Sequence, residues 1–180
     1  MRLKITAAFL LLSIIFTFLV FKGKYFSVNQ GPEAKSATDA LTAEAIINKL
    51  QTSDLRDYKG NKISIDIGAL ATHQGVVVHL WASWCGPCVN EVPELITYAK
   101  AHPDVKFIIV SLDEQQDDIF KFLKSFPEFD SEKFIRIWDG PSSISKFLDA
   151  DRLPMSVILR KDKTGPQIIK SVVDWKNLKL

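Results

Sequence analysis

The sequence predicts an α/β fold in which a mixed central sheet is flanked by helices. Two runs of β-branched and apolar residues, 75–82 and 105–112, have the length and composition of buried strands. Each run is followed by a segment whose apolar residues recur at helical spacing, 89–99 and 119–126. This alternation is typical of α/β domains, and two further strand-like segments near the C-terminus predict a closing hairpin. We expect the domain to occupy residues 41–180.

The first predicted elements of the domain are short. Apolar residues at helical spacing predict a helix over 41–50. A turn signal rich in Lys, Gly and Asn follows at 58–62. Ile63, Ile65 and Ile67 then alternate with polar residues, which indicates a half-buried strand.

The remaining elements follow in the order strand, helix, strand, helix. The first long helix is expected to stop near Pro103 and the second at Pro127, because proline does not continue a helix. The chain ends seven residues after Val173, so we expect no full C-terminal helix. Three further segments complete the prediction: a short strand or extended connection at 134–138, a helix at 144–148, and a hairpin of 155–159 with 167–173 across the turn 163–166.

An apolar segment precedes the domain. Residues 5–21 carry no charge, and as a helix they would span about 25 Å, slightly less than the ~30 Å hydrocarbon core of a bilayer. A small-x-small cleavage site is missing at 18–22, so we predict an uncleaved membrane anchor over residues 1–22. A cleaved signal peptide and a buried core helix are the alternatives. The polar, non-periodic residues 23–40 are predicted to form a tether.

The predicted anchor also suggests a location for the domain. Positive charge is about equal on the two sides of the apolar segment, so it gives little indication of the orientation in the membrane. A long polar domain after one N-terminal span most simply translocates outward. We therefore predict a single-pass protein of the inner (cytoplasmic) membrane whose domain faces the periplasm or the exterior. In that oxidising compartment an isolated cysteine pair stays oxidised unless something reduces it.

The net charge of +2 describes the N-terminus more than the domain. Arg2, Lys4, Lys22 and Lys24 all precede the first acidic residue, Glu33. Without these four, 19 basic residues stand against 21 acidic ones. A domain with this balance gives no support to nucleic-acid binding.

The two cysteines of the chain lie three positions apart, in Trp84-Cys85-Gly86-Pro87-Cys88. At this spacing both sulfurs lie on one side of a helical turn, close enough to form a disulfide. Because strand, turn and helix follow one another here, Cys85 is expected at a helix N-terminus, where free N–H groups and the helix dipole lower the pKa of a thiol. Gly86 lets the turn form, and Pro87 fits the first helical turn, where no N–H is needed.

This arrangement predicts a reversible dithiol–disulfide pair. Cys85 is the candidate nucleophile that attacks a substrate disulfide, and Cys88, one turn inward, is the candidate that resolves the mixed disulfide. The alternative is half of a zinc site, but zinc usually takes four ligands, and His73, His79 and His102 are scattered along the chain. We therefore expect no metal and no cofactor.

The residues 81–88, Trp-Ala-Ser-Trp-Cys-Gly-Pro-Cys, followed by Glu91-Val92-Pro93, resemble the thioredoxin superfamily and, more closely, its membrane-anchored TlpA/ResA-like thiol–disulfide oxidoreductases. The resemblance runs from about Tyr58 to Trp175. It implies a thioredoxin-like sandwich with an N-terminal hairpin and a central insertion. It also implies a membrane thiol carrier as electron donor and protein disulfides outside the cytoplasm as substrates, such as those of apocytochrome c.

The resemblance assigns roles to residues outside the cysteine motif. Pro154 corresponds to a cis proline beside the cysteines, and Leu153 would offer its backbone to an extended substrate; a trans proline that starts an edge strand is the alternative. Trp84 is expected to shield the cysteines and contact the substrate, whereas Trp81 is expected in the core. Pro93 would kink the helix, because a proline removes an internal hydrogen bond.

His79 is the main departure from the family pattern. Six residues before Cys85, thioredoxin has a buried aspartate, and its TlpA-like relatives often have asparagine. A buried acid at this position assists proton transfer at the second cysteine, and an imidazole with an ordinary pKa near neutrality has the same capacity. A neutral, hydrogen-bonded core histidine is the alternative. Glu91, which belongs to the motif, is predicted to support the site.

Four acidic residues follow the second buried strand: Asp113, Glu114, Asp117 and Asp118. They have two interpretations, a metal-binding cluster and the solvated acidic start of a helix. We favour the helix start, because acidic residues are common in a first turn, and all four carboxylates would then be in solvent.

Other functions share some of these residues. A disulfide oxidase or isomerase uses the same pair, although the Gly-Pro dipeptide resembles that of reducing thioredoxins and favours a reductant. A thiol peroxidase would need a Pro-x-x-x-Thr-x-x-Cys setting, which residues 79–84 do not provide. A tethered binding or chaperone module would use a peptide groove without turnover. We predict thiol–disulfide exchange in the reducing direction.

Overall fold

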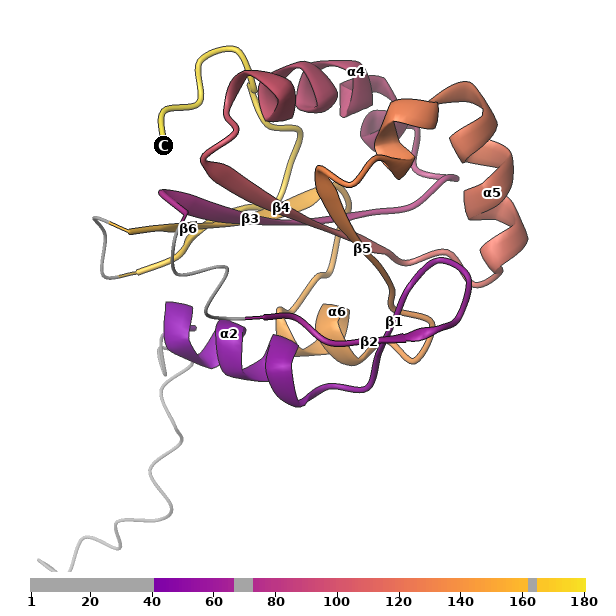
Figure 1. The fold of residues 1–180 in the computed structure, drawn as a ribbon, viewed down its shortest axis with the longest axis horizontal. Helices are drawn as coiled ribbons and strands as arrows, with labels where there is room; N and C mark the ends of the chain where they lie inside the picture. The colour runs from indigo at the N-terminus through magenta and orange to yellow at the C-terminus, as the bar shows by residue number, and fades with distance from the viewer. Residues whose placement is uncertain (1–40, 67–72, 162–164) are drawn as a thin grey trace, which may run out of the picture. The chain divides into compact units, whose positions relative to one another are not determined.

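A seven-stranded mixed sheet organises the fold (Figure 1). The computed structural model describes residues 41–66, 73–161 and 165–180. The strand order is β2-β1-β5-β4-β3-β6-β7, in which β3, β4 and β5 run parallel and every other neighbouring pair is antiparallel. The strands are β1 (Leu55–Arg56), β2 (Lys62–Ile63), β3 (Gly75–Trp81), β4 (Val105–Ser111), β5 (Phe134–Trp138), β6 (Met155–Arg160) and β7 (Gln167–Ile169).

Helices cover both faces of this sheet. In Figure 1, α4 (Gly86–Ala101) and α5 (Gln116–Ser125) lie on one face, and α2 (Ala43–Thr52) and α6 (Ser143–Phe147) lie on the other. A short 3-10 helix, η1 (Pro127–Asp130), follows α5. Each face has its own hydrophobic cluster, so the core consists of two layers separated by the sheet.

Strand β3 at the centre of the sheet supplies side chains to both layers. Val78 and Leu80 belong to the cluster under α2 and α6, whereas Val77 and Trp81 belong to the cluster under α4 and α5. Successive side chains of a strand point to opposite faces. His79 therefore faces α4, the helix that begins at the cysteine motif.

The predicted order of elements is confirmed, but the outer strands are shorter than predicted. The strand expected through Ile63, Ile65 and Ile67 ends at Ile63; Ile65 is buried beyond the last ladder pair, and Ile67 lies outside the described residues. β7 ends at Ile169 rather than at Val173, because the chain beyond it leaves the sheet and packs against α4.

The C-terminal segment, residues 170–180, contains turns and no helix, as the sequence predicts. Val173 and Trp175 are buried in the cluster under α4. The Tyr98 hydroxyl of α4 donates a hydrogen bond to the Leu178 carbonyl at 3.3 Å. The segment therefore covers α4 without being helical itself.

The N-terminal hairpin implied by the family resemblance is present. β1 and β2 pair in antiparallel fashion, with Leu55 opposite Ile63. Gly60 in the turn between them has a φ of 83°, a left-handed conformation that favours glycine. Between β4 and β6 the chain forms α5, η1, β5 and α6.

The predicted anchor (1–22) and tether (23–40) lie outside the described residues. Within 41–66, 73–161 and 165–180, no helix combines the length and the apolar character needed to cross a bilayer.

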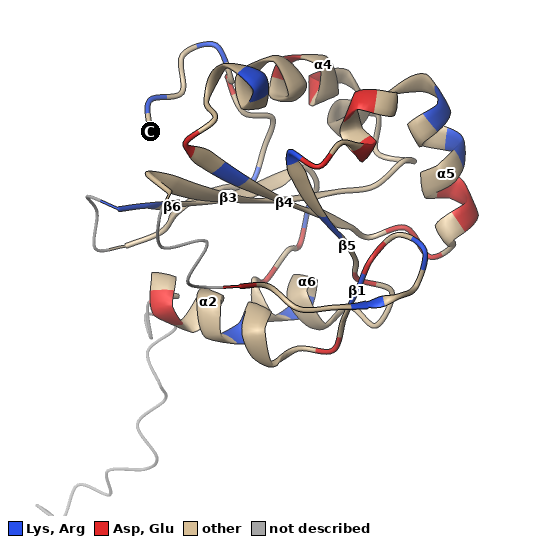
Figure 2. Cartoon of the chain, in the orientation of Figure 1, with Lys and Arg blue, Asp and Glu red and all other residues tan. Residues whose placement is uncertain are grey.

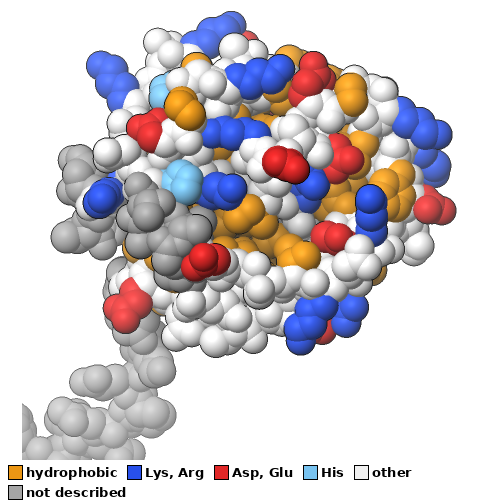
Figure 3. Space-filling model, in the orientation of Figure 1, with side chains coloured by type: hydrophobic (Ala, Val, Ile, Leu, Met, Phe, Trp, Pro, Cys, Tyr) orange, Lys and Arg blue, Asp and Glu red, His pale blue; other side chains and the backbone are white. Residues whose placement is uncertain are grey.

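The surface of the domain carries charges of both signs. Along α5, for example, the acidic residues lie in the first turn and the lysines lie towards the C-terminal end (Figure 2). Apolar side chains reach the surface in a hollow between β2 and β5 (Figure 3). Ile63, Ile65, Phe134 and Ile135 contribute to this hollow, which shares no residue with the cysteine motif.

Candidate active site

Cys85 and Cys88 form a disulfide at the start of α4, and their Cα atoms are 5.2 Å apart. Cys85 is the N-cap of the helix, and its sulfur accepts a hydrogen bond from the Cys88 backbone N–H at 3.3 Å. Cys85 is 6% exposed and Cys88 is fully buried. An incoming thiolate therefore reaches Cys85, as predicted from the sequence.

Two residues between the cysteines shape the access to the disulfide. Pro87 lies in the first turn of α4, as expected, where the missing N–H costs no hydrogen bond. Gly86 is exposed, and a Cβ atom added to it would meet no atom within 4 Å. The turn itself therefore does not require glycine, contrary to our prediction; Gly86 instead leaves the entrance to Cys85 open.

A groove of about 510 Å³ runs past the disulfide. Trp84, 68% exposed, lies on one side, and Leu153 lies on the other, in the loop before β6. The Leu153–Pro154 peptide bond is cis, as the family resemblance implied. The residues that line the groove are Trp84, Cys85, Gly86, Pro87, Leu112, Ala150, Asp151, Arg152 and Leu153. An extended chain in this groove would pass both Cys85 and the backbone of Leu153.

Asp113 corrects one of the sequence predictions. We expected its carboxylate in a solvated turn, but Asp113 is 1% exposed and belongs to the support of the cysteine loop. It accepts hydrogen bonds from the Ser83 backbone N–H at 3.0 Å, the Ser83 hydroxyl at 2.6 Å and the Ser111 hydroxyl at 2.7 Å. These bonds tie the loop before Cys85 to the end of β4, and they explain why the acid is turned inward.

A second buried carboxylate lies on α4. Glu91 follows Cys88 by three residues, so the two side chains share one face of the helix. Its Oε1 atom lies 3.1 Å from Nε2 of His79, and both side chains are essentially inaccessible to solvent. The other ring nitrogen of His79, Nδ1, lies 2.9 Å from the hydroxyl of Ser156, directly opposite on β6. The Val173 backbone N–H donates to the remaining Glu91 oxygen at 3.0 Å.

Burial determines which member of the His79–Glu91 pair titrates near neutral pH. It lowers the pKa of His79 to about 3, because the charged imidazolium is disfavoured away from water. It raises the pKa of Glu91 to about 7, and the hydrogen bond from the Val173 backbone N–H offsets this only in part. We expected the imidazole to be the group near neutrality; in the structure that group is Glu91.

The neutral imidazole can follow the protonation of Glu91. When Glu91 is ionised, a proton on Nε2 of His79 faces the carboxylate, and Nδ1 accepts from the Ser156 hydroxyl. When Glu91 is protonated, an unprotonated Nε2 faces the carboxylic acid, and a proton on Nδ1 is donated to Ser156. The neutral His79 ring can therefore accommodate both protonation states of Glu91 by changing its tautomer.

Several residues of this site carry no local sequence signal, because their partners are distant in the chain. Trp175 packs edge-on to His79, with ring centroids 6.0 Å apart, yet nothing near position 175 indicates a role. Ser156, in the strand predicted at 155–159, likewise carries no local signal of a role. The pairing of the two predicted strands places Ser156 opposite His79, and this pairing is the signal that would have pointed to Ser156.

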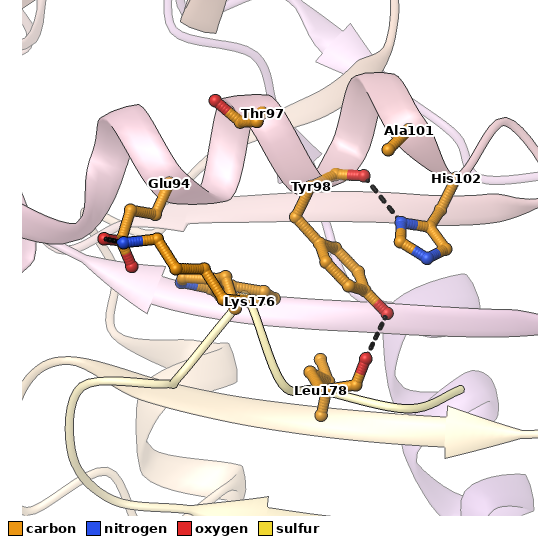
Figure 4. A pocket seen from close by; sticks show the side chains of 8 residues that line it. Glu94, Thr97, Tyr98, Ala101, His102, Lys176 and Leu178 are labelled. Carbon is orange, nitrogen blue, oxygen red and sulfur yellow. Dashed lines mark hydrogen bonds and ion pairs between the residues drawn. The ribbon is translucent and has the colours of Figure 1, made fainter.

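A separate cavity of about 310 Å³ lies along the C-terminal half of α4 (Figure 4). Tyr98 and His102 line it, with their rings stacked 3.9 Å apart, and Lys176 closes one side through an ion pair with Glu94 at 2.7 Å. Neither cysteine contributes to this cavity. The predicted redox residues therefore gather at the other end of the helix.

Known proteins are similar to this chain in sequence and in fold. The Redoxin family matches residues 32–173. The sporulation thiol-disulfide oxidoreductase A of Bacillus subtilis is 27% identical over 121 residues, which cover 61% of this chain and 71% of that protein. The thiol-disulfide oxidoreductase ResA of Bacillus cereus is 28% identical over 162 residues, which cover 89% of this chain and 83% of ResA.

A solved structure supports the fold independently. A secreted disulfide oxidoreductase of Mycobacterium tuberculosis, described as homologous to DsbE of E. coli, matches with a TM-score of 0.59 at 20% identity. The match covers 72% of this chain and 92% of the other. With the family match, the relatives and the Cys85–Cys88 site in agreement, the chain belongs to the Redoxin family of the thioredoxin superfamily and is similar to its TlpA/ResA-like thiol–disulfide oxidoreductases.

Proposed function

We propose that this thioredoxin-like thiol–disulfide oxidoreductase reduces disulfide bonds of proteins outside the cytoplasm. The observation that carries the proposal is the Cys85–Cys88 disulfide, which caps α4 at the floor of a groove between Trp84 and the Leu153–Pro154 loop. Relatives of similar length are named thiol-disulfide oxidoreductases, which supports the same chemistry here.

The reduced protein begins the reaction at Cys85. Its thiolate attacks one sulfur of the substrate disulfide, forms a mixed disulfide and releases the first substrate thiolate. The N-terminus of α4 favours the thiolate, because free backbone N–H groups and the helix dipole point at it. The slight exposure of Cys85, against the complete burial of Cys88, makes this the first step.

Cys88 completes the reaction from the inner side. Its thiol loses a proton, and the resulting thiolate attacks Cys85, so that the Cys85–Cys88 disulfide forms and the second substrate thiolate leaves. The substrate has then gained two electrons, and its two thiolates take up protons. An external thiol donor restores the protein by attack on Cys85 and receives the disulfide in exchange.

Glu91 is the proposed acceptor of the Cys88 proton. It lies one turn further along the same buried face of α4, and burial raises its pKa to about 7. A base of this pKa accepts a proton from a thiol and releases it again near neutral pH. His79 and Ser156 position the carboxylate and adjust to its two protonation states.

The location and the partners belong to the same proposal. Residues 1–22 would anchor the protein in the inner membrane, and residues 23–40 would let the domain reach substrates in the periplasm or exterior. A thiol carrier in the membrane would supply the electrons. Disulfides of an apocytochrome c are one example of a substrate. The apolar run at 5–21, with no cleavage site after it, supports this arrangement.

Trapping of mixed disulfides tests the proposal. In Cys88→Ala, exchange stops after the first step, so the substrate stays covalently bound to Cys85 and is released by dithiothreitol. Cys85→Ala is the matched control and should trap nothing, because Cys88 is buried. Non-covalent recovery of the same partners by a variant without either cysteine, with full biological activity, would indicate a binding module instead. A pair found mainly oxidised in cells with intact donors would argue for an oxidase.

A further inference from the structure

The disulfide groove continues into a second pocket. This pocket has a volume of about 360 Å³ and shares Leu112, Ala150 and Asp151 with the groove. It extends along α6 and the loop that follows, so a chain seated at Cys85 can continue into it. Its other lining residues are Ser142, Ser145, Lys146 and Asp149.

The acidic residues of the two pockets are already paired. Asp149 and Asp151 both bind Lys170, which follows β7, at 3.2 and 2.8 Å. The Lys170 ammonium also donates to the Asp149 carbonyl at 2.7 Å. One lysine therefore holds both carboxylates at the wall of the groove.

The basic residues of the two pockets form fewer or longer ion pairs than the acidic residues do. Arg152 is 67% exposed, and its contact with Asp151 is a longer one of 3.5 Å. The Lys146 side chain forms no ion pair with any residue that the structure describes. Together with Lys170, three cations stand here against two carboxylates. This excess is local, since the chain without its four N-terminal cations has more acidic than basic residues.

Contacts within the protein hold the wall of the second pocket in place without a bound substrate. Ser142 and Asp149 are the non-glycine residues with positive φ in the described part of the chain, at 58° and 53°, and both line this pocket. Such conformations persist where surrounding contacts hold them, and they are frequent at binding sites. Hydrogen bonds from the Ala150 N–H to the Ser145 carbonyl and from the Asp149 N–H to the Lys146 carbonyl fix the loop. A substrate would therefore bind without reordering this wall.

We propose that Lys146 and Arg152 make the groove select disulfide substrates that carry an acidic side chain close to the reacting cysteine. The inference rests on the proposed function, because it assigns a substrate class to the same groove. Apolar contact with Trp84 and Leu153 holds the chain near the cysteine, and a carboxylate where the two pockets meet replaces water around Arg152 of the groove and Lys146 of the second pocket. Arg152 offers a planar pair of donors suited to a carboxylate.

Peptide disulfides of matched sequence test this selectivity. Short peptides with one cysteine, and with Glu, Gln or Lys at the second position on both sides of it, are oxidised to symmetric dimers. The rate at which each dimer oxidises the reduced protein gives the preference. We expect the Glu peptide to react about fivefold faster than the Lys peptide at low salt, the size of one or two exposed ion pairs, with Gln between them. The ratio should approach one at 0.5 M salt, where exposed charges are screened.

Charge reversal then identifies the residues responsible. In the double variant Lys146→Glu/Arg152→Glu, the order of the three peptides should reverse. The control Lys100→Glu/Lys124→Glu changes the net charge equally at exposed positions outside both pockets, and it should keep the original order. Equal rates for the three peptides, or an unchanged order in the first variant, would overturn the inference. A protein that no peptide oxidises would contradict the proposed function as well, so the two failures are distinct.

Discussion

Asp113 and Glu91 are both buried carboxylates near the cysteine motif, yet their surroundings differ. Asp113 accepts hydrogen bonds from a backbone N–H and two hydroxyls, all from segments next to the disulfide loop or β4. Glu91 accepts from the Val173 N–H and lies beside a neutral imidazole, and burial raises its pKa to about 7. The two carboxylates therefore differ in their donors: Asp113 holds a loop in place through three of them, whereas Glu91 has one backbone donor and a pKa that burial raises.

The largest expected effect is the loss of stability in Asp113→Ala. The substitution leaves the Ser83 N–H and the hydroxyls of Ser83 and Ser111 without their acceptor, and each unsatisfied buried group costs about 1–3 kcal/mol. We expect the free energy of unfolding to fall by about 3 kcal/mol in urea denaturation. Asp113→Asn keeps one acceptor oxygen and should lose less. A loss below about 1 kcal/mol in Asp113→Ala would contradict the anchoring role.

Glu91→Gln should change the pH dependence of stability. The ordinary pKa of this glutamate is 4.5, and the folded value is about 7. Between these values the folded state keeps a proton that the unfolded state has lost, so the stability of the native protein falls as pH rises from about 4.5 to 7. Glutamine removes this slope. We expect Glu91→Gln to gain up to about 3 kcal/mol relative to the native protein between pH 4.5 and 8, since one pKa unit corresponds to about 1.4 kcal/mol.

Asp113→Asn is the matched control for this measurement, because it also neutralises a buried carboxylate. Parallel stability curves of the native protein and Glu91→Gln from pH 4.5 to 8 would show that Glu91 does not titrate there. The raised pKa that distinguishes Glu91 in this comparison would then be absent.

Local sequence signals were sufficient for the disulfide and for the order of the strands and helices. The Cys-Gly-Pro-Cys spacing, with Pro87 in the first helical turn, fixes the cysteines at a helix start, and the alternation of apolar runs predicts the order of strands and helices. The cis bond before Pro154 followed from the family resemblance alone. The disulfide and the helix start depend on residues close together in the sequence.

The contacts around His79 and Glu91 join distant parts of the chain; the sequence pointed to both residues but did not reveal these contacts. Glu91 meets the Val173 N–H, 82 residues further along the chain, and His79 meets Ser156, 77 residues away. Asp113 is separated from Ser83 by 30 residues, so its carboxylate looked like part of an ordinary helix start. Sheet pairing and the packing of α4 bring these groups together, and neither is encoded by a local motif.

His79→Asn tests whether the imidazole contributes to proton transfer. The shorter side chain leaves space beside Oε1 of Glu91, water can enter, and the pKa of Glu91 should fall towards its ordinary value. We expect the inflection near pH 7 in the rate of thiol exchange to move about one unit lower, with a rate about threefold lower at pH 7. Glu91→Gln should abolish the inflection. An unchanged profile in His79→Asn would leave His79 as a purely structural residue.

The smallest expected effect is that of Ser156→Ala, which removes the partner of Nδ1. A proton on Nδ1 would then be buried without an acceptor, so the imidazole should keep its proton on Nε2, where it faces Glu91. This tautomer favours the ionised carboxylate, and the inflection near pH 7 should move lower by a few tenths of a unit. Nitrogen chemical shifts of the His79 ring report the tautomer directly, and Ser156→Thr, which keeps the hydroxyl, is the control. If both variants hold the same tautomer mixture as the native protein, Ser156 does not set the state of the ring, and Glu91 owes its raised pKa to burial alone.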